Sequence, residues 1–308
     1  MAFCYRRSTL LAIAATAMAL GFAVPTEAEI LVVKSDSLPQ YEAPIEAFRA
    51  AVDDEIMVIN IEGSREKGEH RLRSAMSDGT VNGIFALGTQ AAYLSKAILP
   101  SVPMSFAMVL NWERYEFASP ATGVSVEIPV EILFTRFRLL LPETKRIGLI
   151  YSDKISEQTL ATARKAARAL GVSLVEEKVR YSDDVVGAYR RIRTAVDALW
   201  MPTDPVVVTR DNFKYLSGRC RHDDIAFLAF SENFVRAGAL LSISPDYRTM
   251  GSQAAVLLEH AMAKPSAPPA VQAPLGSTLV INSEVARAIG IDLTAGVLGM
   301  ADVVIGND

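Results

Sequence analysis

The sequence has few of the residues on which covalent catalysis and metal binding depend. Its 308 residues include two cysteines and three histidines. Cys4 lies ahead of the first apolar stretch and Cys220 is far downstream, so no internal disulfide is expected in an exported chain. The cluster Cys220-Arg221-His222-Asp223-Asp224 has metal-ligating residue types, but its spacing fits no standard zinc pattern. We therefore expect no metal.

Motifs that mark common enzyme families are also absent. The sequence contains no Gly-x-Ser-x-Gly elbow, phosphate loop, dinucleotide fingerprint or His-Glu-x-x-His motif. No cofactor is therefore expected, and no residue set argues for an enzyme. Catalysis stays open as an alternative, with Asp204 and His222 as its best candidate groups, although they form no recognisable nucleophile–base pair.

The chain lacks an excess of positive charge. It has 31 Lys and Arg residues against 35 Asp and Glu residues, which gives a formal net charge of −4. No basic patch of the kind that neutralises phosphates stands out, so nucleic acid is not an expected partner. Half of the residues are hydrophobic, which is ample for one large or two medium cores.

Long apolar runs are missing except near the N-terminus. Arg6 and Arg7 precede the apolar stretch 10–24, which is too short to cross a membrane, and Thr26-Glu27-Ala28 suits a cleavage site. We predict that residues 1–28 are a cleaved secretory signal. Cleavage after Ala23 and an uncleaved anchor are the alternatives. Because Cys4 lies too early to carry a lipid, the sequence predicts a free periplasmic protein.

One stretch organises the rest of the chain. The apolar run 84–87 ends at Gly88-Thr89, and a helical pattern follows over 90–98. This layout predicts a buried parallel strand, a sharp turn at Gly88 and an N-cap at Thr89. The free N–H groups of such a helix start can hold an anion such as a carboxylate. An ordinary strand-to-helix turn is the alternative.

The chain contains this layout twice. The segment 196–204 resembles 81–89 at an offset of 115 residues, and 147–153 resembles 30–36 at an offset of 117. Two matches at nearly one offset indicate two similar α/β halves. The carboxyl ends of their sheets would face each other, and ligands of open α/β sheets bind at those ends.

Strand-like and helical segments alternate along the whole chain, which predicts parallel sheets covered by helices on both faces. Irregular connections near 111–122, 243–246 and 264–276 predict three crossings between two lobes. The expected fold class is α/β, with two doubly wound parallel-sheet lobes joined by three hinge crossings. We assign residues 29–115 and 245–268 to the first lobe, and 116–244 and 269–308 to the second. A helix over 211–217 is expected to stop at Gly218.

Several short motifs, taken in order, point to a known family. They are Ala86-Leu87-Gly88-Thr89-Gln90-Ala91-Ala92, Ala121-Thr122-Gly123-Val124-Ser125, Leu141-Pro142-Glu143-Thr144-Lys145-Arg146-Ile147-Gly148 and Asn282-Ser283-Glu284-Val285-Ala286-Arg287-Ala288-Ile289-Gly290. With this order and spacing, the chain resembles type I periplasmic binding proteins from about Ile30 to Ile305. More narrowly, it is similar to the ABC-transporter substrate-binding branch that includes tryptophan- and tyrosine-binding members.

The resemblance implies two hinged lobes that close on a small molecule, usually an amino acid or a relative, and deliver it to a membrane permease. By family position, and with Gly88 as the point of close backbone approach, the implied ligand-binding residues are Ser35, Tyr41, Gly88, Thr89, Gln90, Ser125, Tyr151, Ser152, Asp204 and Ser231. The sequence departs from the family's pattern at Ala121 and in the loop 111–115, and these two differences leave the ligand unidentified.

The leading hypothesis is therefore an exported, monomeric solute-binding protein of an ABC transporter. The alternative is a periplasmic sensor that presents its bound state to a membrane kinase or cyclase. Within the site, Thr89 is expected to hold the ligand's carboxylate and Asp204 its ammonium group, from opposite lobes. The alternative for Asp204 is that it caps the segment after Pro205.

Overall fold

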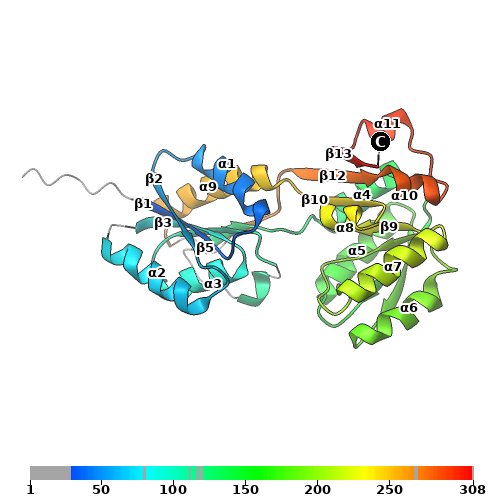
Figure 1. Cartoon of the computed structure of the whole chain (residues 1–308), viewed down its shortest axis with the longest axis horizontal. Coiled ribbons are helices and arrows are strands. Elements are labelled where there is room, and N and C mark those ends of the chain that lie inside the picture. The colour runs from blue at the N-terminus through cyan, green and yellow to red at the C-terminus, as the bar shows by residue number, and fades with distance from the viewer. Residues whose placement is uncertain are drawn as a thin grey trace, which may run out of the picture.

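The computed structural model describes residues 29–78, 81–110, 112–115, 117, 121–266 and 270–306. The expected signal segment, residues 1–28, lies outside these. Figure 1 shows two lobes side by side, joined by extended segments. No helix in the described part of the chain is both long and apolar enough to span a membrane.

The first lobe is built on a sheet in which every pair of neighbouring strands is parallel. Its spatial order is β11 (Ala270–Gln272), β5 (Ala121–Val124), β4 (Met104–Ala107), β3 (Val81–Leu87), β1 (Glu29–Lys34) and β2 (Glu55–Asn60). The central strands β1, β3 and β4 are almost wholly apolar and buried, as expected for a sheet that is covered on both faces.

Helices cover both faces of this sheet. One apolar cluster joins α1 (Glu42–Arg49) and α9 (Tyr247–Ala263) to residues such as Val32 and Phe85. A second cluster joins α2 (Arg65–Asp78) and α3 (Thr89–Ile98) to the opposite face. The late helix α9 is thus an integral part of the first lobe.

The second lobe has a seven-stranded sheet. Its spatial order is β13 (Val303–Ile305), β12 (Ser277–Asn282), β10 (Leu241–Pro245), β9 (Ala226–Ala229), β8 (Ala198–Trp200), β6 (Arg146–Tyr151) and β7 (Ser173–Lys178). All pairs are parallel except β10 with β12, which run antiparallel. The predicted fold class is confirmed, with this one antiparallel pair as the exception.

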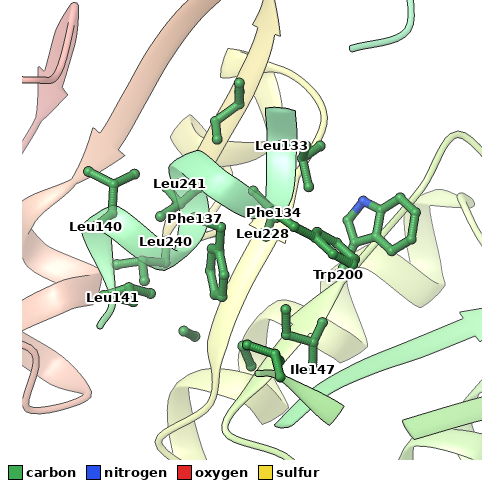
Figure 2. Packing of buried hydrophobic residues seen from close by; sticks show 14 of the residues in the cluster. Leu133, Phe134, Phe137, Leu140, Leu141, Ile147, Trp200, Leu228, Leu240 and Leu241 are labelled. Atoms are coloured by element: carbon green, nitrogen blue, oxygen red, sulfur yellow. The ribbon is translucent and has the colours of Figure 1, made fainter. Parts of the chain in front are cut away.

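The helices of the second lobe also divide between two faces. On one face, α4 (Val130–Leu140), α5 (Glu157–Ala169) and α10 (Ser283–Ala288) enclose the cluster shown in Figure 2. Phe134 packs edge-on against Trp200, with ring centroids 5.1 Å apart. On the other face lie α6 (Val185–Ile192) and α7 (Arg210–His222). Two short helices, α8 (Glu232–Arg236) and α11 (Ala295–Leu298), complete the lobe.

The strand order supports the repeat inferred from the sequence. The order β2-β1-β3-β4-β5 of the first sheet recurs as β7-β6-β8-β9-β10 in the second. Register agrees as well, because Ile30 pairs with Gly83 and Ile147 pairs with Ala198. Counting on from these pairs makes Thr89 and Asp204 equivalent positions, each just beyond a strand end.

Three crossings connect the lobes, and the first lies later than predicted. The chain leaves the first sheet only after β5, so this crossing is 125–129 rather than 111–122. The other two lie at 245–246 and 273–276, inside the predicted ranges. Because β5 and β11 pair within the first sheet, 121–124 and 270–272 belong to the first lobe and not to the second.

Gly218 does not end its helix, contrary to the expectation. Helix α7 continues to His222 because Leu216 and Cys220, on either side of Gly218, are both anchored in the core. Glycine weakens a helix without forbidding it, and tertiary packing decides the outcome. The same packing explains why Cys220 lies within the helix, beyond the point at which the helix was expected to end. The short helix α8 had no counterpart in the sequence analysis.

Two helical glycines should respond oppositely to alanine. A Cβ on Gly251 of α9 would overlap the carbonyl oxygen of Pro44 in α1, whereas a Cβ on Gly218 would meet nothing within 4 Å. Gly251→Ala should lower the free energy of unfolding by about 1–3 kcal/mol, and Gly218→Ala should raise it by about 0.5–1 kcal/mol. Urea unfolding checks both. A Gly251→Ala protein as stable as the wild type would show that the α1–α9 contact is dispensable.

Candidate functional site

A cleft of about 1320 Å³ lies between the lobes, beside the crossings. Both lobes and all three crossings contribute to its wall. Residues that matter for its chemistry are Tyr41, Trp112, Glu113 and Arg114 from the first lobe, Ser125 and Glu127 from the first crossing, and Lys154, Trp200, Thr203, Phe230 and Ser231 from the second lobe. A hydrogen bond from the Arg114 guanidinium to the Lys154 carbonyl oxygen, 3.3 Å long, spans the two lobes.

Three of the predicted site residues line this cleft. Tyr41 ends the 3-10 turn Pro39–Tyr41 before α1, and burial raises the pKa of its hydroxyl above the usual range. Ser125 opens the first crossing, where its N–H donates to Gln272 O at 2.8 Å. Ser231 lies at the N-terminus of α8 in the second lobe. These three therefore form polar positions on both sides of the cleft.

In the first lobe, the turn from β3 to α3 is closed by hydrogen bonds to the protein's own side chains. Ser35 Oγ accepts the N–H of Ala91 at 2.9 Å and donates to Leu87 O at 3.0 Å, so it satisfies one of the free donors of α3. Gly88 is the N-cap, with φ of 85°, and Thr89 is the first residue of the helix rather than its cap. Gln90 donates to Gly63 O at 3.3 Å. Ser35, Gly88, Thr89 and Gln90 lie outside the wall of the cleft.

The equivalent turn of the second lobe, after β8, is also closed by the protein's own hydrogen bonds. Asp204 is 0% exposed, and its carboxylate accepts from Ser152 N at 2.6 Å, Ser152 Oγ at 3.0 Å and Val206 N at 2.9 Å. Tyr151 and Ser152 also lie outside the wall of the cleft. Three hydrogen bonds satisfy the buried Asp204 carboxylate without a ligand. These contacts favour the alternative in which Asp204 caps the segment after Pro205, and Thr89 and Asp204 do not face each other across the described cleft.

Sequence reasoning did not single out Glu127 and Thr203. Glu127 lies in the first crossing, and its carboxylate accepts from Thr203 Oγ1 at 3.3 Å. Burial first, and then the negative charge of Glu113, raises the pKa of Glu127 above its ordinary value of 4.5. The sequence did contain a usable signal. Glu127 lies two residues after the Thr-Gly-Val-Ser motif and two residues before Pro129. The start of this motif was assigned to an irregular crossing, although it belongs to strand β5.

The cysteine–histidine cluster gives no metal site. Among the described residues, no group of three or more His, Cys, Asp or Glu side chains is placed to hold a metal ion. Cys220 is buried in α7, and burial raises the pKa of its thiol to about 12. Asp223 instead accepts from Tyr189 at 3.0 Å and from Arg219 at 2.9 Å. The cluster fastens α6 to α7.

Two doubly wound lobes on three crossings, with a cleft between them, have the fold of type I periplasmic binding proteins. Comparison of the sequence with models of protein families identifies the family. The model of the ABC transporter substrate binding protein family matches residues 54–305, and the chain belongs to that family.

Known relatives agree with this assignment. The tyrosine-binding protein of Clostridioides difficile (strain R20291) is 25% identical over 185 residues, which cover 56% of this chain and 52% of the relative, so the match spans about half the length of that protein. An ABC domain from Streptococcus pneumonia in complex with L-Trp has a TM-score of 0.62 at 20% identity and covers 91% of this chain and 100% of its own.

A second similar structure is the ligand-free, open form of a substrate-binding protein with adhesive properties from Clostridium difficile. Its TM-score is 0.74 at 18% identity, and the match covers 90% of this chain and 99% of that one. These two structural likenesses establish the fold.

The two hypotheses for Asp204 predict different results for Asp204→Asn. An amide has one acceptor oxygen, so its NH₂ group would face either Ser152 N–H or Val206 N–H. If Asp204 is a cap, the free energy of unfolding should fall by about 1–3 kcal/mol, measured by urea unfolding against exposed Asp292→Asn as control. Unchanged stability together with lost ligand binding would instead restore Asp204 as a ligand contact.

Glu127→Gln should stabilise the ligand-free protein at neutral pH. A raised pKa in the folded state means that folding disfavours the charged carboxylate, so this group lowers stability above the folded pKa. This loss of stability disappears as the pH falls below 4.5, the ordinary pKa of a glutamate side chain. Thermal unfolding should therefore show a higher midpoint for Glu127→Gln at pH 7 and converging midpoints near about pH 4. A lower midpoint at pH 7 would contradict the assignment of a desolvated charge.

Proposed function

We propose that this protein captures an amino acid or a related zwitterion between its lobes and delivers it to an ABC permease, without catalysing a reaction. The observation that carries the proposal is the cleft, which is lined by both lobes and placed beside all three crossings. A ligand that contacts both walls binds the closed arrangement more tightly than the open one and so shifts the lobes towards closure.

The chemistry of the wall supports a solute with an apolar body and polar ends. Trp112, Trp200, Phe230 and Tyr41 offer aromatic surface, and Ser125 and Ser231 offer hydroxyl groups. Binding sites for small molecules are typically of this kind, mainly apolar with a few polar groups that set orientation. Relatives named for tyrosine and for a complex with L-Trp make aromatic amino acids the first candidates.

The proposal includes export to the periplasm by the segment 1–28 and action as a monomer. A membrane sensor in place of a permease would use the same closing cleft. Cross-linking of ligand-loaded protein to its native membranes distinguishes the two, because the captured partner is either a transport subunit or a signalling protein.

Thermal unfolding against the twenty standard amino acids tests the proposal. A ligand at a hundred times its dissociation constant should stabilise the protein by ~2.7 kcal/mol. L-tyrosine and L-tryptophan are expected to raise the midpoint, and small-angle scattering of the same samples should show a smaller radius of gyration. A midpoint that no amino acid moves would contradict the proposal, and a shift without compaction would contradict lobe closure.

A further inference from the structure

Glu127 occupies an unusual position for a carboxylate. It lies in the first crossing, between the end of β5 and the start of α4, and it forms part of the cleft wall. Its N–H donates to Ser125 Oγ at 3.1 Å, and Ser125 N in turn donates to Gln272 O of the neighbouring strand β11. The backbone at Glu127 is therefore held, through Ser125, to strand β11 of the first sheet.

The carboxylate has little to satisfy it within the protein. Among the described residues, its hydrogen-bond donor is the Thr203 hydroxyl at 3.3 Å, which gives a neutral and long hydrogen bond. In the described part of the chain, no Lys or Arg forms a salt bridge with it, and its charged neighbour is another carboxylate, that of Glu113. Arg114, next to Glu113, donates to the Lys154 carbonyl oxygen. Two negative side chains from different segments thus share one side of the cleft.

Asp204 provides the contrast. That carboxylate is fully buried but accepts three hydrogen bonds, two of them from backbone N–H groups. Glu127 is partly buried, and its raised pKa reflects a charge that neither a cation nor backbone donors compensate. A half-buried carboxylate without a cationic partner lowers stability, and such groups concentrate at sites where a ligand completes the pairing.

We propose that Glu127 is the residue that binds the cationic group of the solute, so that the cleft selects ligands that carry an amine. This inference rests on the proposed function and specifies the ligand chemistry of the same site. An ammonium group beside Glu127 and Glu113 would remove the uncompensated charge as the lobes close. The indole rings of Trp112 and Trp200 line the same cleft and suit the apolar body of such a ligand.

Matched ligands separate the amine from the rest of the molecule. The probes are L-tyrosine with 3-(4-hydroxyphenyl)propionate, and L-tryptophan with 3-(indol-3-yl)propionate, where the second member of each pair lacks the amino group. Calorimetry should show that the wild type prefers the amine-bearing member. Glu127→Gln keeps an acceptor for Thr203 and deletes the charge, so it should weaken amino-acid binding by at least about thirtyfold and leave binding of the deaminated acids unchanged.

Two further variants guard the interpretation. Glu127→Asp retains the carboxylate and should keep a preference for the amine, whereas Glu259→Gln, an exposed change near the end of α9 and away from the cleft, should behave as the wild type. The proposal is overturned if the Glu127→Gln protein binds L-tyrosine and L-tryptophan as the wild type does. That result would mean that Glu127 acts only as a hydrogen-bond acceptor for Thr203, a role that glutamine retains. Equal binding of amine-bearing and deaminated probes by the wild type would overturn it as well.

The binding data distinguish a failure of the proposed function from a failure of the role proposed for Glu127. If the wild type binds none of these probes and no other standard amino acid, the proposed function falls and the role of Glu127 falls with it. If the wild type binds and only the Glu127→Gln prediction fails, the proposed function stands.

Discussion

Backbone hydrogen bonds fasten the crossings to one another and to the strands beside them. Ser125 N–H donates to Gln272 O, Asp246 N–H donates to Gly276 O, and β10 pairs with β12 up to Pro245. These bonds join a crossing to another crossing or to a strand beside it, or two strands within one sheet, and not one lobe to the other. A rotation at the ends of the crossings therefore need not break them, which is the arrangement that a hinge requires. The cleft lies where the crossings leave the sheets, so its geometry depends on this pairing.

Much of the fold was predictable because apolar strands and polar turns alternate regularly. Runs such as 84–87 and 147–150 are buried as expected, and the offsets of 115 and 117 residues reflect equivalent strands of two similar lobes, β3 with β8 and β1 with β6. Errors arose where tertiary packing outweighed local signals. Gly218 stays within α7 since its neighbours are anchored in the core, and the Thr-Gly pair at 122–123 forms a sheet strand where an irregular crossing was expected.

The site was less predictable than the fold. Sequence equivalence correctly places Thr89 and Asp204 at matching strand ends, but it contains no information on which polar groups the protein itself satisfies. Ser35 closes the turn after β3 and Ser152 the turn after β8, through contacts between segments more than fifty residues apart. Glu127 stands out only once the position of the crossing and the depth of the cleft are known, since desolvation is a property of the folded surroundings.

The position of α9 bears on the order in which the lobes can form. Five strands of the second sheet, β6 to β10, come from one unbroken stretch of chain, whereas the first lobe needs α9, some two hundred residues after α1, to cover one face of its sheet. Bringing distant segments together carries a larger loop-closure entropy than local assembly. In a chain that emerges with its N-terminus first, the earlier strands must wait with an uncovered apolar face while the later lobe assembles. The first lobe therefore receives its last covering helix only after strands β6 to β10 of the second lobe have been synthesised.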